Sequence, residues 1–512
     1  MVAESKSEPD YHAIDIESIE QKELRTVGAE HLLLHFASHL GLEKTLRQLG
    51  LTEKECALAL ATIIGRAVFP ASERATHTWL QTRSGLGELL DFDFSKTSLN
   101  QLYTISDVLL THKEPLESHL EAAQQEFHGY RSTMVLYDIT NTYMEGQAKK
   151  NPKAKHGVSK EKRTDCPLVT LGLVINEYGF ATRSSILAGN IAEPLTLKDA
   201  IEALYSSQDL FKPTIVLDAG IATEENLKWL RDQGFAYVVC ARQNPPSEEL
   251  AGTLTSVGNE EKTQVKVAFV KTEGIDEKWL YCESEAKEAT ASQMMNMFQK
   301  RFEEDLNKLR DGIQKPKGRK QLSKILERVG RLKEKHRRIS SAYEITVKPS
   351  EDGQIATAIH WTVNTEKLEQ KLNGYYYLRT YLLNNTPEEL WSLYNSLRKV
   401  EDAFRFMKSS LGMRPIYHQK EGRVDAHLWI TLLAYHLIQA CLYQLQQAGL
   451  SYNWETIRNR MSGRVRVTMQ AKTEKGTTLH HRSTTKAESN QREIYMALKM
   501  TPQILKTKKI FI

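Results

Sequence analysis

The spacing of apolar residues changes several times along the chain, and each change predicts a structural boundary. Between residues 28 and 128, apolar positions recur every three or four residues, as in HLLLHFASHLGLEKTLRQLG, KECALALATIIGRAVF and TSLNQLYTISDVLL. This period is typical of amphipathic helices, so we expect an all-helical domain over 28–130. Residues 1–27 are polar and acidic at their start, and we expect a flexible N-terminus there.

From residue 133 the pattern changes to short apolar runs, which predict strands. Three runs come first, and then a helical stretch, a fourth run, a helix that begins at Thr223 and a fifth run. The five runs are TMVLYDIT, PLVTLGLVIN, TRSSILAG, PTIVLDAG and FAYVVCAR. Strands and helices in this order predict an α/β sheet over 131–242, the first part of a catalytic core.

The residues after this sheet, 243–384, alternate between strand-like segments and a highly charged helical stretch. Because they separate the sheet from the next amphipathic helices, we expect an insertion domain with β-strands and basic helices. Residues 385–447 return to helices that would pack on the sheet and complete the core. Residues 448–512 form a basic C-terminal region with one strand-like piece, GRVRVTM, and a final helix near 491–506. The whole pattern predicts a multidomain α/β protein.

The composition narrows the class of protein. The chain has 512 residues, 40% of them hydrophobic and 26% charged, and a net charge of +5, which fits a globular protein. Its five cysteines are scattered without a CxxC pair, so a zinc knuckle or a disulfide framework is not expected. The N-terminus lacks the apolar core of a signal peptide, and the apolar stretch 428–445 contains His436, Gln439 and Gln444. We therefore expect a buried helix there, no membrane partner and a cytoplasmic protein.

Three acidic residues stand out because of the segments that carry them. Asp138 follows the apolar run MVLY, and Asp218 follows TIVL. The carboxyl ends of neighbouring strands meet at one edge of a sheet, so both aspartates are expected at that edge. Glu401 lies in the middle of YNSLRKVEDAFRFMK (394–408), seven residues from either end, which is close to two helical turns.

A helix over 394–408 would present Glu401 among cations. The other residues expected on the Glu401 face are Tyr394, Arg398, Arg405 and Lys408. A separate apolar stripe lies beside this face and would bury itself against the core. Asp402 is the obvious rival of Glu401, but it points about a quarter-turn or more away from that face. We therefore prefer Glu401 as the third acid.

Three carboxylates around a small volume repel one another and favour a divalent cation between them. Hard oxygen ligands select Mg²⁺ or Mn²⁺, and two ions about 3.5–4 Å apart can activate a water or a 3′-hydroxyl and stabilise the departing oxygen. Taken singly, a strand-end aspartate is more often a turn residue, and a Glu–Lys helix pair is more often surface electrostatics. In the order Asp138, Asp218 and Glu401, the three acids favour a two-metal phosphodiester site.

Basic segments outside the acids predict contacts with the DNA backbone. The loop KAKHGVSKEKR (153–163) lies between the first two strands, and its expected contacts are Lys160 and Arg163. The stretch 315–338 has eleven Lys or Arg residues, which implies a salt-dependent and sequence-independent grip. Its expected contacts are Arg319, Lys320 and Arg331. A solvated loop and a charged helical hairpin that serves only solubility remain the alternatives for these two segments.

The order and wording of these motifs resemble the DDE transposases of bacterial insertion sequences. The matching stretches are VLYDITNTYMEG, VLDAGIATEENL, FAYVVCAR, VEDAFRFMKSSLGMRPIYH and DAHLWITLLAYHL. Within that family the chain is similar to the IS-four-type group, which has a Tyr, Arg, Glu, Lys signature around the third acid. The arginine of that signature is Leu397 here. The resemblance implies a ribonuclease-H-like mixed sheet with flanking helices, interrupted by an insertion domain. It also implies a metal-binding triad and two phosphate contacts: Asp138, Asp218, Glu401, Tyr394 and Lys408.

We therefore expect a transposase that binds the terminal inverted repeats of its element through the helical DNA-binding domain 28–130, in which a helix could enter a groove. It would cleave DNA by two-metal-ion hydrolysis and join the 3′-OH ends to target DNA. Its partners would be double-stranded transposon ends and target DNA, and two ends require a homodimer in the synaptic complex. Its location would be the bacterial cytoplasm, at the nucleoid. Two alternatives remain: a stand-alone metal-dependent DNA nuclease, and a catalytically silent DNA-binding protein derived from a transposase. The presence of all three acids argues against the second alternative.

Overall fold

The chain folds into two compact units. The structure, a computed structural model, describes residues 10–129, 132–160, 163–205, 211–258, 264–272, 274, 276–315, 320–369 and 374–512. Unit 1 comprises Met1–Ala236 and Ser396–Ile512, and unit 2 comprises Tyr237–Asn395. The second unit is thus inserted into the chain of the first.

The helices expected between residues 28 and 128 are present in unit 1. They are α1 (Gly28–His39), α2 (Leu42–Gln48), α3 (Glu53–Val68), α4 (Glu73–Thr82), α5 (Leu86–Leu89), α6 (Leu99–Thr111) and α7 (Lys113–His128). Two of them begin at capping boxes, in which Thr52 pairs with Glu55 and Ser98 pairs with Gln101. These helices belong to the same compact unit as the strands that follow them.

The centre of unit 1 is the long helix α16 (Glu421–Gln447), which contacts α1, α3, α6 and α7. Its indole at Trp429 donates to the carbonyl oxygen of Leu109 at 2.9 Å. Among the described residues, one helix, α16, is long and apolar enough to cross a membrane. The bent pair α3 and α4 passes the same test only if the two helices count as one span. However, 78% of the apolar window of α16 is buried inside the protein. The prediction of a buried helix at 428–445 is confirmed.

The strands of unit 1 that follow the helices form a mixed sheet in the order β4-β3-β2-β5. They are β2 (Met134–Tyr143), β3 (Leu168–Asn176), β4 (Ala181–Ala188) and β5 (Thr214–Leu217). β2 pairs antiparallel with β3 and parallel with β5. Between β4 and β5 lie η3 (Glu193–Thr196) and α8 (Leu197–Glu202), and α9 (Glu224–Asp232) follows β5. The helix α15 (Arg398–Ser410) packs against β2 and β3.

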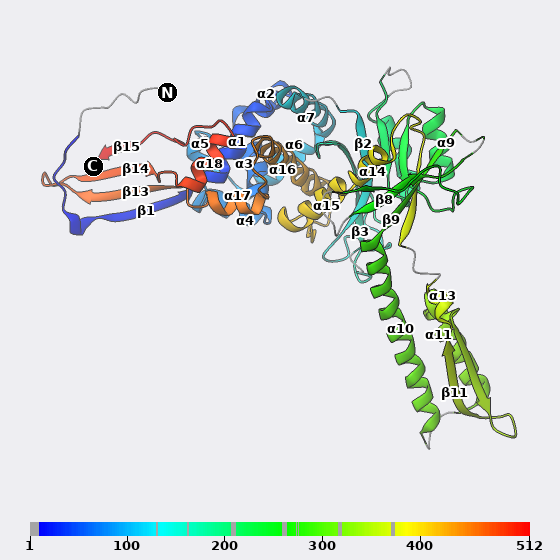
Figure 1. Ribbon diagram of the computed structural model, residues 1–512. Coiled ribbons are helices and arrows are strands. Elements are labelled where there is room, and N and C mark those ends of the chain that lie inside the picture. Colours follow the sequence, from blue (N-terminus) through cyan, green and yellow to red (C-terminus); the bar gives the residue numbers. More distant parts are fainter. Residues whose placement is uncertain are drawn as a thin grey trace. The chain divides into compact units, whose positions relative to one another are not determined.

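Both ends of the chain contribute to a second sheet of unit 1, in the order β1-β13-β14-β15 (Figure 1). Its strands are β1 (Glu20–Thr26), β13 (Val465–Lys472), β14 (Thr478–Thr484) and β15 (Lys508–Phe511), accompanied by α17 (Trp454–Met461) and α18 (Ser489–Ala497). The expectation of a flexible segment over 1–27 is therefore wrong for β1. The expected final helix ends at residue 497 rather than 506. Most side chains of β1 are exposed, so backbone pairing rather than an apolar face holds this strand.

Unit 2 contains a sheet in the order β6-β12-β9-β8-β7. Its strands are β6 (Tyr237–Cys240), β7 (Thr255–Val257), β8 (Val265–Phe269), β9 (Lys278–Ser284) and β12 (Tyr375–Thr380). The helix α14 (Pro387–Asn395) contacts β6, β7 and β8. The inserted unit thus begins and ends several residues outside the expected boundaries of 243–384.

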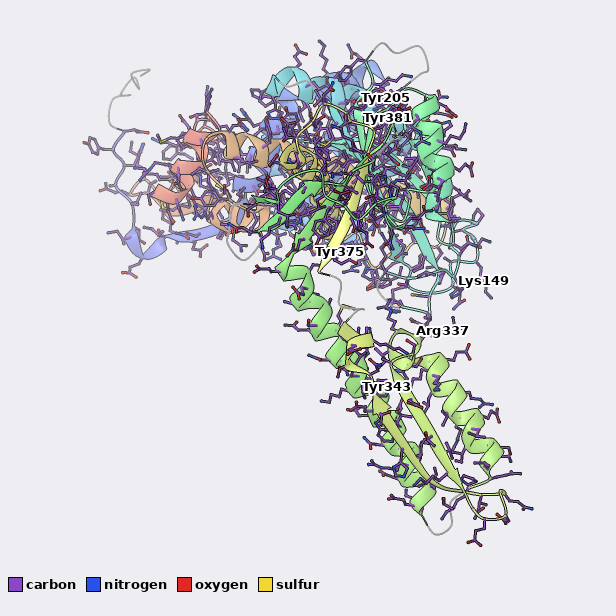
Figure 2. The ribbon with its side chains drawn as sticks, turned by 45° about the vertical axis from the view of Figure 1, so that its right-hand side comes forward. Lys149, Tyr205, Arg337, Tyr343, Tyr375 and Tyr381 are labelled. Atoms are coloured by element: carbon purple, nitrogen blue, oxygen red, sulfur yellow. The ribbon has the colours of Figure 1, made fainter. Side chains whose placement is uncertain are left out.

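An arm projects from the unit 2 sheet, and we define it as residues 285–363. It comprises α10 (Glu285–Gln314), α11 (Leu322–Lys335), α12 (Arg337–Ser340), β10 (Tyr343–Pro349) and β11 (Ala356–Val363), followed by α13 (Thr365–Glu369). Tyr343, labelled in Figure 2, packs against Phe302, and the centroids of the two rings are 4.8 Å apart. Its hydroxyl donates a hydrogen bond to the Glu303 carboxylate at 2.8 Å. A second small core, which includes Ile325 and Val329 of α11, lies along the same helices. The arm therefore has apolar cores of its own.

Candidate active site

β2 and β5 run parallel, and their register brings Asp138 and Asp218 together. The paired positions end at Tyr137 and Leu217, so the two aspartates are the next residues on either strand. β5 ends there, whereas β2 continues to Tyr143 in pairing with β3. The prediction that the first strand ends at its aspartate is therefore wrong. The neighbouring strand ends instead, which leaves the edge of β2 open beside Asp138.

The Asp138 carboxylate is largely buried, with 14% of its side chain exposed. Burial raises the pKa of Asp138 from 3.8 to about 6, although the Lys160 ammonium and the Ile139 N–H, which donates to Oδ1 at 2.7 Å, act in the opposite direction. The charges of Asp218 and Glu193 raise this pKa further. A carboxylate in this position is stabilised in its ionised form by an additional cation.

Lys160 supplies positive charge from the loop that the sequence predicted to contact DNA. Its Nζ donates to a backbone carbonyl of β2 at 2.7 Å, and it lies 3.9 Å from Asp138 Oδ1 and 3.8 Å from Glu193 Oε1. Asn141 fastens the loop to β2, because its Nδ2 donates to Val158 O at 2.8 Å and its Oδ1 accepts from the Lys160 N–H at 3.1 Å. The loop is thus folded against the acids.

Glu193 is an additional acid near Asp138 and Asp218, and no sequence pattern pointed to it. It begins η3, the short 3₁₀ helix after β4. A Cβ built at Gly220 would overlap the Glu193 carboxylate and would lie 3.8 Å from Asp218 Oδ2. The two acids therefore flank the same glycine. The sequence signal for Glu193 is weak, since it is an acid before Pro194 in a connecting segment rather than a residue at the end of an apolar run.

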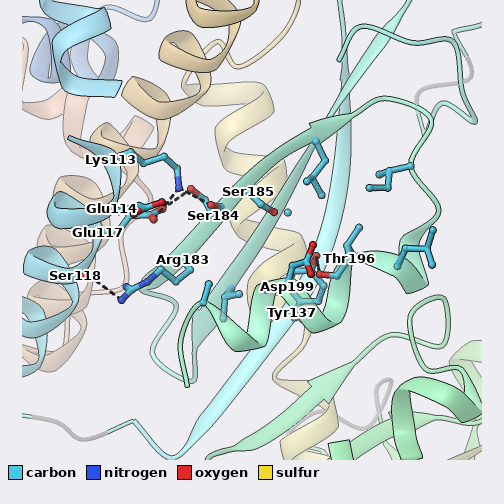
Figure 3. Close-up of a pocket in the computed structure, with 17 residues that line it drawn as sticks. Lys113, Glu114, Glu117, Ser118, Tyr137, Arg183, Ser184, Ser185, Thr196 and Asp199 are labelled. Carbon is cyan, nitrogen blue, oxygen red and sulfur yellow. Dashed lines mark hydrogen bonds and ion pairs between the residues drawn. The ribbon is translucent and has the colours of Figure 1, made fainter. Parts of the chain in front are cut away.

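The other side of β2 has a different character. A cavity of about 390 Å³ lies there. Tyr137 and Thr196 are among its lining residues (Figure 3). The Tyr137 hydroxyl donates to the Thr196 carbonyl oxygen at 3.3 Å, and Lys113 in the same cavity is paired with Glu117 at 2.9 Å. Successive residues of a strand face opposite sides. Tyr137 therefore anchors β2 to η3 on one side, while Asp138 faces the other side, where Asp218 and Glu193 act on it.

The helix α15 carries Glu401 in its first turn and Lys408 near its end. Burial lowers the pKa of Lys408 to about 8, the charge of Lys160 lowers it further, and that of Asp138 raises it. Lys408 is therefore within electrostatic reach of Asp138. Glu401 is exposed, and its side chain has no hydrogen bond or ion pair within the described part of the chain. On a continuous helix, Glu401 lies on the same face as Lys408 and about 10 Å along the axis.

Tyr394 does not share this helix. α14 ends at Asn395 and α15 begins at Arg398, so the prediction of one helix from Tyr394 to Lys408 is wrong. Tyr394 belongs to unit 2, where its ring lies 6.4 Å from that of Tyr376. No glycine or proline marks the break, which is why periodicity alone continued the helix through it.

The other predicted DNA contacts are dispersed. Arg398 and Arg405 are exposed on α15, and Arg405 is paired with Asp402 at 2.9 Å. Arg163 binds Asp165 at 2.7 Å and stacks over a tyrosine ring. Of the predicted contacts in the arm, Lys320 is half-buried, Arg331 is exposed and paired with Glu327, and Arg319 lies outside the described residues.

A separate group, Glu73, His418 and His427, has the residue types of a metal site within 4.8 Å of one another. Its atoms are already engaged. Arg66 Nη2 lies 3.7 Å from Glu73 and donates to His427 Nδ1 at 3.2 Å, while His427 Nε2 donates to Met413 O at 3.3 Å. His418 Nε2 lies 3.2 Å from Glu73. Because Arg66 already binds Glu73 and His427, these residues fit a buried polar network rather than a metal centre.

Comparison with known proteins identifies one family. A family model described as a transposase DDE domain matches residues 146–437, a range that includes Asp218 and Glu401 and begins after Asp138. No curated protein matches the chain. Six solved chains match it. One of them is a piggyBac transposase from a cryo-EM synaptic complex with hairpin DNA, 7% identical, with a TM-score of 0.36, covering 89% of this chain and 82% of that chain. A likeness of that size does not identify a fold.

Proposed function

The chain belongs to the family of the transposase DDE domain, and we propose that it cuts the ends of its own DNA element and joins them to target DNA. The observation that carries this proposal is the parallel register of β2 and β5, which sets Asp138 beside Asp218. Lys160 lies 3.9 Å from Asp138 Oδ1, and the charge of Asp138 also acts on Lys408. Acids that can hold metal, with cations that can hold phosphate, suit a phosphodiester substrate.

The donor set suits Mg²⁺ or Mn²⁺. Carboxylate oxygens are the hard ligands that these ions prefer, and the burial and like charges that raise the pKa of Asp138 are conditions that a divalent cation relieves. Asp138, Asp218 and Glu401 would hold two ions. When bound, these ions supply an activated water or 3′-hydroxyl and a counter-charge for the departing oxygen.

The chain's own lysines would position the DNA. Lys408 has a pKa near 8 because it is partly buried, and a phosphate beside it favours its charged form. Lys160 lies 3.9 Å from the Asp138 carboxylate. Together the two ammonium groups would hold the scissile phosphate against the acids. The spacing of Tyr394, Glu401 and Lys408 along the chain supports membership of the IS-four-type group, although Leu397 stands where that signature has an arginine.

The arm offers a second kind of DNA contact. Four cations of α11 recur at helical spacing on one exposed face: Lys324, Arg328, Arg331 and Lys335. Ile325 and Val329 occupy the buried face of the same helix. The four cations extend over about 16 Å, a length that can follow several backbone phosphates. Such a stripe supports a grip that depends on salt and not on sequence.

Transposition sets the partners that this proposal requires. Two transposon ends must reach one target DNA, so the acting species would be a homodimer that synapses the ends. A cut-and-paste reaction on bacterial DNA would take place in the cytoplasm, at the nucleoid.

A strand-transfer assay tests the proposal. Purified full-length protein is incubated with paired duplexes of the element's own terminal repeats, a supercoiled target plasmid and Mg²⁺. We expect cleavage at the repeat ends and joining of the 3′-ends to the plasmid, both abolished by a chelator. Cleavage without joining would show a stand-alone nuclease instead. Binding without cleavage would show a catalytically silent DNA-binding protein.

A further inference from the structure

Glu193 is held beside the aspartates by contacts between its segment and the turn after β5. The amide of Asn226, which is buried, donates to Pro194 O at 2.8 Å and to Ile221 O at 2.9 Å. One side chain thus ties the segment that carries Glu193 to the turn that carries Asp218. These two hydrogen bonds fix the separation of the two acids through the backbone.

Two further features hold Glu193 close to Asp138 and Asp218. The Tyr137 hydroxyl binds the carbonyl of Thr196, so η3 is also tied to the strand of Asp138. Gly220 lies two residues after Asp218, and any side chain at this position would occupy the space of the Glu193 carboxylate. The turn after β5 therefore leaves room for Glu193. A connecting segment whose acid served only solubility would need neither the clamp nor the space.

Lys160 provides an independent sign that a cation belongs between the acids. Its ammonium lies 3.9 Å from Asp138 Oδ1 and 3.8 Å from Glu193 Oε1, so it bridges the two carboxylates. Lys160 and Glu193 also line a cavity of about 600 Å³, together with Asn141, Gly157 and other residues of the loop and β2. This cavity therefore reaches Lys160 and Glu193, whereas Asp138 and Asp218 do not line it.

On the premise of the proposed function, we propose that Glu193 is a fourth acid of the metal site and that Lys160 is its internal counter-ion. In the metal-free protein the ammonium bridges Asp138 and Glu193. Asp138 and Glu193 would together hold a divalent cation in place of this ammonium. The freed lysine is then available to a phosphate of the DNA.

Mn²⁺ binding to the full-length protein without DNA tests this inference, with the free ion measured by electron paramagnetic resonance. Glu193→Gln should weaken Mn²⁺ binding by about tenfold or more, since it removes one charged ligand. Lys160→Met should tighten binding, because it removes the competing ammonium. Glu202→Gln is the matched control, since Glu202 is exposed nearby on α8, and it should leave the affinity unchanged. Thermal melting of each variant shows whether it is folded.

The outcomes separate this inference from the proposed function. Unchanged affinity in Glu193→Gln, or weaker binding in Lys160→Met, would overturn the inference while leaving the Asp138 site intact. Unchanged affinity in Asp138→Asn would instead remove the proposed metal site itself. A wild-type protein that binds no Mn²⁺ would contradict both.

Discussion

The helices of unit 1 and the arm of unit 2 both contain Arg–Glu ion pairs, but unit 1 contains a buried pair and the arm an exposed one. The Arg66 and Glu73 side chains are 6% and 9% exposed, whereas those of Arg331 and Glu327 are 75% and 59% exposed. Breaking a buried pair leaves an uncompensated charge, while an exposed pair contributes little because water and salt screen it. The stability of unit 1 should therefore depend on each buried ion pair, whereas the number of cations on the arm should affect DNA binding more than stability. Variants in the two regions should differ accordingly in what they change.

The largest effect is expected at the third acid. Glu401→Gln should lower the rate of end cleavage by about 10³-fold or more, because loss of a metal ligand removes several kcal/mol of transition-state stabilisation. Asp402→Asn is the matched control, since Asp402 is the exposed neighbouring acid on α15. Single-turnover cleavage of a labelled terminal repeat measures both. Equal losses in the two variants would show that the identity of the third acid is wrong.

The next effect concerns stability. Arg66→Met should lower the free energy of unfolding of unit 1 by about 3–5 kcal/mol, because the buried Glu73 keeps only His418 as a partner and His427 Nδ1 loses its donor. Arg331→Met removes an exposed cation of the arm and should change stability by less than about 1 kcal/mol. Urea denaturation of both variants gives the two values. A small loss for Arg66→Met would contradict the difference between the two regions.

Acid should destabilise unit 1 before the arm. Burial lowers the pKa of both His427 and His436 from 6.5 to about 3, so the folded protein keeps them neutral while the unfolded chain protonates below pH 6.5. The unfolded state then binds more protons, and the free energy of unfolding falls as the pH drops, by about 1–2 kcal/mol per histidine at pH 5.

The arm should respond at lower pH. Hydrogen bonds from Lys335 and His336 hold the pKa of Asp305 below 3.8, so its stabilising charge is present above pH 3.8 and is lost only below it. Proteolysis in urea at pH 7 and pH 5, with fragments identified by mass, shows which unit opens first. Earlier cleavage within the arm at pH 5 would contradict this order.

The smallest effect is expected from the basic stripe of the arm. Replacing Lys324, Arg328, Arg331 and Lys335 by Gln should weaken DNA binding uniformly across sequences. The slope of log affinity against log salt should fall by up to about 3.6, or about 0.9 for each phosphate that is no longer neutralised. Fluorescence anisotropy at several salt concentrations measures this slope. An unchanged slope would restrict the role of the stripe to solubility.

The sequence predicted the parts of unit 1 that local patterns specify. The apolar runs before Asp138 and Asp218 became strands, and parallel pairing brought these residues together as expected. The continuation of β2 beyond Asp138 depends on its pairing with β3, a long-range contact that no local pattern contains. Strand β1 was missed because its side chains are mostly exposed. Glu193 was missed because its position depends on Asn226, which meets the Glu193 segment only in the folded protein.

The proposed mechanism requires that acids from distant parts of the chain share a pair of metal ions. A crystal structure of the protein with its terminal DNA and Mn²⁺, with the ions located by anomalous scattering, would reveal whether they do. We predict two manganese peaks about 3.5–4 Å apart, coordinated by Asp138 and Asp218 and with Glu401 as a ligand of at least one ion. Manganese bound elsewhere, or Glu401 beyond coordination distance of both peaks in the DNA complex, would contradict the mechanism.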